Sequence, residues 1–104
     1  MKLKKILNNE EFLLSFEVFP PKNDTAFQSV KSAVEEIAAL KPAFVSVTYG
    51  AGGGTSRYTP EMARAVTERS GVSTLAHLTC VSSTKETVRQ RIKELREYGI
   101  ENVM

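Results

Sequence analysis

A carboxylate, a hydroxyl and an imidazole occur in three separate strand-like runs of this sequence, at Glu17, Thr48 and His77. Glu17 lies in Leu14-Ser15-Phe16-Glu17-Val18-Phe19-Pro20-Pro21, an apolar run that two prolines end. A carboxylate is costly to bury unless it is paired or hydrogen-bonded, so Glu17 faces solvent, has a partner or takes part in chemistry. If the three side chains converge, proton transfer on a small molecule is the chemistry that they suit.

Three strand-like runs alternate with three helical patterns, and these elements would have to position the polar side chains. The strands are predicted at residues 13–19, 44–49 and 74–81, and residues 100–104 resemble the start of a fourth strand. Such alternation predicts an α/β fold with parallel strands. An open doubly wound sheet and a (β/α)8 TIM barrel both fit. Since a barrel takes ~250 residues, we expect residues 1–104 to be the N-terminal three βα units of one barrel domain, without an internal boundary.

Turn and capping residues predict where the helices begin and end. Asp24 or Thr25 suits the N-cap of the first helix, whose apolar positions recur at intervals of three and four from residue 27 to residue 40. Thr59, with a proline after it, suits the next N-cap. Gly71 is placed to end that helix. A capping box is predicted from Ser83, and the last helix is predicted to run to residue 99.

Side chains alternate across a strand, so the strands can be compared face by face. Each has an apolar face suited to helices and a second face that becomes polar near its C-terminal end, carrying Glu17, then Ser46 and Thr48, then His77. Ligands bind at the carboxyl ends of parallel strands in both candidate folds. Taken singly, Glu17 could be an ion-paired edge residue, Thr48 strand filler and His77 a buried histidine. The glycine run at residues 50–54 fits an anion-binding nest or a permissive turn equally well.

Composition excludes several classes of protein. The 104 residues are 41% hydrophobic and 25% charged, with a net charge of +2, which is typical of a globular domain rather than a disordered tail or a nucleic-acid binder. A lone histidine without further ligands at metal spacing gives little support to a metal site. Cys80, the single cysteine, suits a reducing compartment, and no apolar run is long enough for a signal peptide or a membrane span. We therefore expect a cytoplasmic protein with no nucleic-acid or membrane partner.

Several motifs together resemble the methylenetetrahydrofolate reductase family, in the order and spacing of that family. These are Ser15-Phe16-Glu17-Val18-Phe19-Pro20-Pro21-Lys22, then Lys41-Pro42-Ala43-Phe44-Val45-Ser46-Val47-Thr48-Tyr49-Gly50-Ala51-Gly52-Gly53, then Ala76-His77-Leu78-Thr79-Cys80, and finally Gly99-Ile100-Glu101-Asn102-Val103. The resemblance covers nearly all of the chain after the first dozen residues. Val18 departs from the aromatic residue common in the family, and the family's Leu-Arg-Gly-Asp segment, expected after Met104, is not in this sequence.

The resemblance implies a (β/α)8 flavoprotein that uses NADH or NADPH to reduce FAD. The flavin then reduces 5,10-methylenetetrahydrofolate to 5-methyltetrahydrofolate, a step of one-carbon metabolism and methionine biosynthesis. It implies that Glu17 is the general acid toward the folate, that Thr48 contacts the nicotinamide or flavin region, and that Tyr49, Ala51 and His77 contact the flavin. It also implies a homo-oligomer at full length, while the isolated chain is expected to be inactive. A non-catalytic binding or assembly module, or another barrel enzyme such as a lyase or aldolase, remains an alternative.

Overall fold

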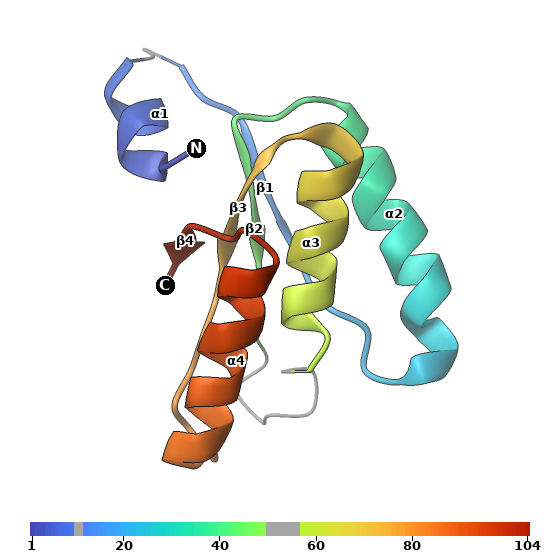
Figure 1. Ribbon diagram of the computed structural model, residues 1–104. Coiled ribbons are helices and arrows are strands. Elements are labelled where there is room, and N and C mark those ends of the chain that lie inside the picture. The colour runs from blue at the N-terminus through green and yellow to red at the C-terminus, as the bar shows by residue number, and fades with distance from the viewer. Residues whose placement is uncertain (10–11, 50–56) are drawn as a thin grey trace.

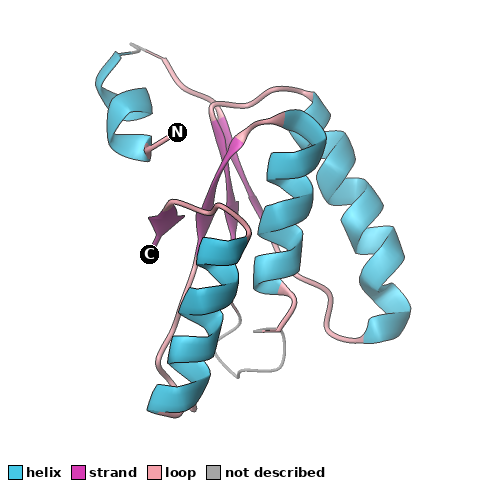
Figure 2. Ribbon diagram, viewed as in Figure 1, coloured by secondary structure: helices cyan, strands magenta, loops and turns pink. Residues whose placement is uncertain are grey.

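The computed structural model describes residues 1–9, 12–49 and 57–104 (Figure 1). Helices and strands alternate along most of the chain (Figure 2). In chain order the elements are α1 (Leu3–Asn9), β1 (Ser15–Val18), the 3-10 turn η1 (Asp24–Ala26), α2 (Phe27–Ala39), β2 (Phe44–Val47), α3 (Thr59–Ser70), β3 (Ser73–Ala76), α4 (Lys85–Glu97) and β4 (Asn102–Val103).

The four strands form one parallel sheet in the order β1-β2-β3-β4, which confirms the predicted α/β class and parallel strands. All three predicted strands are shorter in the structure, where they end at Val18, Val47 and Ala76. β2 ends at Val47, and the proline at position 20 has no N–H to donate to a ladder. Beyond β3, His77 N–H still donates to the Val47 carbonyl at 2.9 Å and Leu78 N–H to the Met104 carbonyl at 2.8 Å.

Helices α2, α3 and α4 lie on one side of the sheet (Figure 1). The apolar side chains of the strands alternate toward these helices and form the core with them. This core is buried and consists of Val18, Val34, Ala38, Val45, Val47, Met62, Ala63, Val66, Val72, Ala76, Leu95 and Ile100. The opposite side of the sheet, called the open face below, carries the alternate residues of each strand, including Glu17, Ser46 and Leu75.

The helix ends agree with the sequence at the glycines and differ from it at the caps. Gly71 and Gly99 both have left-handed backbone conformations, with φ of 71° and 72°, as residues that end helices do. Asp24 and Thr25, the predicted N-caps of the first helix, lie within the 3-10 turn, whose own N-cap is Asn23 with its side chain accepting the Ala26 N–H. The N-cap of α2 is Ala26, which makes no side-chain cap hydrogen bond. The predicted cap at Ser83 is also wrong, because Thr84 caps α4 and accepts the N–H of the residue three positions on.

Thr59 was expected to be the N-cap of α3, but it is the first residue of that helix, and the N-cap is Tyr58. The Thr59 side chain is buried and its hydroxyl donates to the Thr48 carbonyl at 2.8 Å. A tertiary hydrogen bond therefore takes the hydroxyl that the local pattern assigns to the cap. It ties the start of α3 to the residue that follows β2.

The N-terminal helix α1 lies apart from the other helices, near the start of β4 (Figure 1). Asn102 joins the two: its side-chain oxygen accepts the Leu3 N–H at 2.9 Å, and its amide nitrogen donates to the Met1 and Thr74 carbonyls, each at 3.1 Å. The Met1 amino group also pairs with Glu101 at 3.2 Å. Among the described residues no helix is both long enough and apolar enough to cross a membrane.

Candidate active site

Three polar side chains from neighbouring strands meet on the open face. Glu17 comes from β1, Ser46 from β2 and His77 from the residue after β3. The parallel register pairs Glu17 with Ser46, and it pairs Val47 with Ala76, so that His77 follows one position further along. The strands therefore bring a carboxyl, a hydroxyl and an imidazole together near their carboxyl ends, where parallel sheets bind ligands.

The imidazole is the centre of this cluster. His77 Nε2 lies 2.7 Å from Ser46 Oγ, which is a hydrogen bond, and 4.0 Å from Glu17 Oε2, which is an ion-pair distance only when the ring is protonated. The Glu17 side chain is 52% exposed and that of His77 is 21% exposed. The carboxyl group is therefore open to a ligand, while the imidazole is largely enclosed. An arrangement of this kind can donate or accept a proton at a bound molecule.

Thr48 and Tyr49 follow β2 in the chain. Backbone hydrogen bonds hold Thr48, and Tyr49 is buried. The Thr48 N–H donates to the Val18 carbonyl at 3.1 Å, while its own carbonyl accepts the Thr59 hydroxyl. Thr48 as a whole is half-buried, just beyond the end of β2. Tyr49 is buried, with 3% of its surface exposed. Ala51, the remaining residue predicted to contact a cofactor, lies outside the described residues.

Ser46 is the site residue that the sequence reasoning did not single out. Alternation already places it on the polar face of β2, two positions before Thr48. The signal that could have identified it is the parallel register, which sets it directly beside Glu17. Register depends on contacts between segments far apart in sequence, so the strand's own residues do not reveal it.

A second polar cluster ties together the segments that follow β1 and β2. The Tyr58 hydroxyl donates to the Asp24 carboxylate, and Arg57 donates to both, with 3.0 Å between Arg57 and Asp24. The pKa of Tyr58 is raised, first by its hydrogen bond to Asp24 and then by burial. The pKa of Arg57 is also raised, first by its hydrogen bond to Tyr58 and then by the negative charge of Asp24. The Tyr58 ring also packs against Phe27, the first residue of α2. This cluster fixes the helix starts at the carboxyl end of the sheet.

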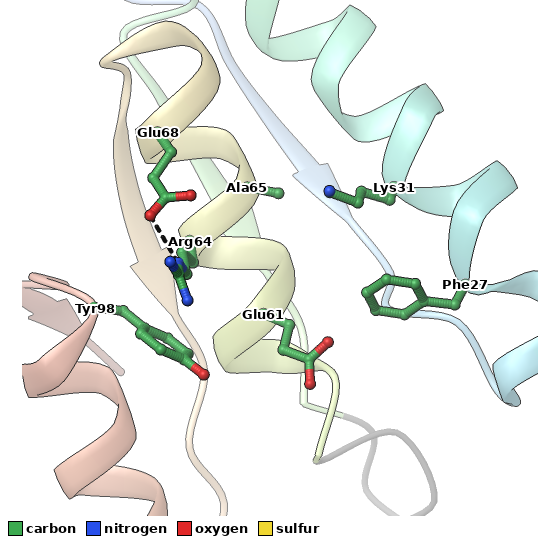
Figure 3. Close-up of a pocket in the computed structure, with 7 residues that line it drawn as sticks. All are labelled: Phe27, Lys31, Glu61, Arg64, Ala65, Glu68 and Tyr98. Atoms are coloured by element: carbon green, nitrogen blue, oxygen red, sulfur yellow. Dashed lines mark hydrogen bonds and ion pairs between the residues drawn. The ribbon is translucent and has the colours of Figure 1, made fainter.

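A groove of about 450 Å³ lies between α2, α3 and the end of α4 (Figure 3). None of Glu17, Ser46 and His77 lines it. Within it Arg64 pairs with Glu68 at 2.7 Å and stacks on the Tyr98 ring at 4.9 Å. Acidic and basic side chains alternate around the groove, so their charges largely balance. Its lining residues are Phe27, Lys31, Glu61, Arg64, Ala65, Glu68 and Tyr98.

Polar side chains at the carboxyl end of the sheet could bond to an organic ligand. In residues 1–9, 12–49 and 57–104 no three His, Cys, Asp or Glu side chains form a group that could hold a metal. Thr48 and His77 offer a hydroxyl and an imidazole just beyond the carboxyl ends of β2 and β3. Such groups can bond to the carbonyl and ring-nitrogen edge of a heteroaromatic cofactor.

Comparison with known proteins gives one consistent result. Residues 2–104 match the family model described as methylenetetrahydrofolate reductase. The 5,10-methylenetetrahydrofolate reductase of Buchnera aphidicola subsp. Acyrthosiphon pisum is 37% identical over 103 residues, which are 99% of this chain and 35% of the relative. That of Escherichia coli is 33% identical over 91 residues, which are 88% of this chain and 31% of the relative.

A plant protein is similar over the same stretch. Methylenetetrahydrofolate reductase (NADH) 1 of Arabidopsis thaliana is 31% identical over 103 residues, which are 99% of this chain and 17% of the relative. The chain thus spans about a third of the length of the bacterial relatives and less of the plant protein.

Proposed function

Since the chain belongs to the methylenetetrahydrofolate reductase family, we propose that the protein carrying it reduces 5,10-methylenetetrahydrofolate to 5-methyltetrahydrofolate. The electron donor in this proposal is NADH or NADPH, and the name of the Arabidopsis relative specifies NADH. One structural observation carries the proposal. A half-exposed carboxyl group, Glu17, lies 4.0 Å from an imidazole on the open face of a parallel sheet.

We propose that residues 1–104 are one continuous part of a single (β/α)8 barrel domain. Helices cover one face of the sheet, whereas parallel sheets generally have both faces covered. Apolar side chains at the two edge strands support the packing of further strands there, since Leu14 and Phe19 beside β1 are 54% and 70% exposed, and Val103 and Met104 are 49% and 66% exposed. In a closed barrel the open face becomes the interior, and Glu17 and His77 lie near its mouth.

The proposed general acid is Glu17. Its carboxyl group would donate a proton to the folate as the five-membered ring opens to an electrophilic iminium, and its exposure leaves room for that substrate. FAD, when bound, would supply the hydride that the iminium accepts. His77 and Thr48 would bind one edge of the flavin ring, and Tyr49 and Ala51, which follow β2 in the sequence, are proposed to contact it. A homo-oligomer in the cytoplasm completes the proposal.

The proposal is tested by separating, under anaerobic conditions, the two half-reactions of the FAD-loaded full-length protein that carries residues 1–104. Glu17→Gln keeps the size of the side chain but cannot donate a proton as a carboxylic acid does. Oxidation of the reduced flavin by methylenetetrahydrofolate should fall by about 10²- to 10⁴-fold, whereas reduction of the flavin by NADH should be retained.

Glu36→Gln is the matched control, because Glu36 lies exposed on α2 among the helices. Both of its half-reactions should equal those of the wild type. A wild-type protein that binds no FAD, or whose reduced flavin does not react with the folate, would refute the proposed function. Equal losses in both half-reactions of the Glu17 variant would refute the role of Glu17 as acid.

A further inference from the structure

Two side chains compete for the same nitrogen of His77. Ser46 Oγ is 2.7 Å from Nε2, within the normal range of a hydrogen bond, and Glu17 Oε2 is 4.0 Å from it, beyond that range. Ser46 is 8% exposed, so its hydroxyl has little access to water. A hydroxyl can donate to Nε2 or accept from it, and it therefore satisfies either neutral tautomer of the ring.

Without this hydroxyl, the imidazole would have a different partner. The His77 side chain is 21% exposed, and a largely enclosed polar group that loses its hydrogen bond is costly. The Glu17 carboxylate is already at 4.0 Å and sits on a flexible, half-exposed side chain, so it can close on Nε2. The proton that the two groups share would then reside on the imidazole, and the carboxylate would stay ionised. An ionised carboxylate cannot act as a general acid.

We propose that Ser46 is a positioning residue, which holds the His77 imidazole on β2 and so keeps the Glu17 carboxyl beyond hydrogen-bond distance of the ring and able to carry a proton. This inference rests on the proposed function only where it concerns the folate reaction. The titratable groups of the cluster are Glu17 from β1 and His77, the residue after β3. β2 contributes the hydroxyl of Ser46, the residue after β2 contributes that of Thr48, and β4 consists of the uncharged Asn102 and Val103. These statements concern the described part of the chain.

The first test measures the folate half-reaction across pH in the FAD-loaded protein. Ser46→Ala should lower its rate about tenfold at neutral pH and move its optimum to lower pH, because an opposite charge at this distance favours the ionised carboxylate. Flavin reduction by NADH should fall less than the folate half-reaction and should not change its pH optimum, and Ser46→Thr, which keeps the hydroxyl, should restore the folate rate. Ser15→Ala, on the same face of β1, is the matched control and should change neither half-reaction.

The second test reads the His77 ring directly and does not depend on turnover. In protein labelled with 15N-histidine, the His77 signals are identified by their loss in His77→Gln. Ser46→Ala should move them toward the imidazolium position at pH 7, and the move should disappear in the double variant with Glu17→Gln. If Ser46→Ala does not fold, Ser46→Cys, with similar volume and only a weak donor, should shift the signals in the same direction.

The outcomes separate the inference from the proposed function. A wild-type protein that does not reduce the folate would refute the proposed function, and the His77 spectra would still decide whether Ser46 keeps the ring from Glu17. Wild-type ring signals in the Ser46→Ala variant would overturn the inference. So would a shift of the same size when Glu17 is replaced, since the carboxylate would then not be its cause.

Discussion

Replacing Thr59 with valine isolates the hydrogen bond between the start of α3 and the end of β2. The Thr59 hydroxyl is buried, at 1% residue exposure, and donates to the Thr48 carbonyl at 2.8 Å. Valine has nearly the same shape, so the substitution leaves no cavity, but it takes the donor from a carbonyl that is only partly open to water. A buried acceptor that loses its partner costs about 1–3 kcal/mol, and the partial exposure of Thr48 favours the lower half of that range.

Urea denaturation of the protein measures this cost. With a slope of about 1–3 kcal/mol per molar urea, a loss of about 1.5 kcal/mol lowers the midpoint by about 0.5 to 1.5 M. Thr67→Val is the matched control within α3. The Thr67 hydroxyl donates to the Ala63 carbonyl at 3.1 Å, but that carbonyl already accepts a backbone N–H in the helix. Its contact with the Thr74 hydroxyl is long, at 3.4 Å, so the control should cost less than about 0.5 kcal/mol. A wild-type midpoint for Thr59→Val, or an equal loss in the control, would refute the reasoning.

Two further substitutions test the helix ends. Gly71→Ala should destabilise the protein by about 1 kcal/mol in thermal unfolding. A methyl group at this position would meet no atom within 4 Å, so the cost comes only from the left-handed backbone. An unchanged melting temperature would contradict this. Tyr58→Phe should lower the urea midpoint at pH 8, with a smaller difference at pH 11. The hydrogen bond to Asp24 raises the pKa of Tyr58 above 10.0, so its stabilisation is complete below pH 10 and is lost as the pH rises through the folded-state value. A difference that stays constant up to pH 11 would speak against this bond.

Features that depend only on local sequence could be predicted. Gly71 and Gly99 were placed at helix ends because few other residues adopt positive φ cheaply, and both do so in the structure. Alternation placed Glu17 and His77 on one face, and the structure brings them within 4.0 Å. These inferences need only the period of the strand or the conformational range of glycine.

Features set by long-range contacts were not predictable in this way. The hydroxyl of Thr59 fits the local rule for an N-cap, yet the carbonyl of a distant strand takes it. The bond between Ser46 and His77 depends on the register of β2 against β3, which neither strand specifies alone. Helix α1 was not predicted, since polar residues interrupt its apolar pattern, and it owes its place to Asn102.

The Asn102 hydrogen bonds also bear on the order in which the chain folds. They join residues separated by 99 and 101 positions, so α1 cannot adopt its final place until β4 has been made. At a synthesis rate of about 5–20 residues per second, the first helix waits about 5 to 20 seconds for its partner. During that interval the first residues of the chain are accessible to chaperones and proteases. Docking of α1 is a late, non-local step, and it must bear the entropic cost of closing a loop of about a hundred residues.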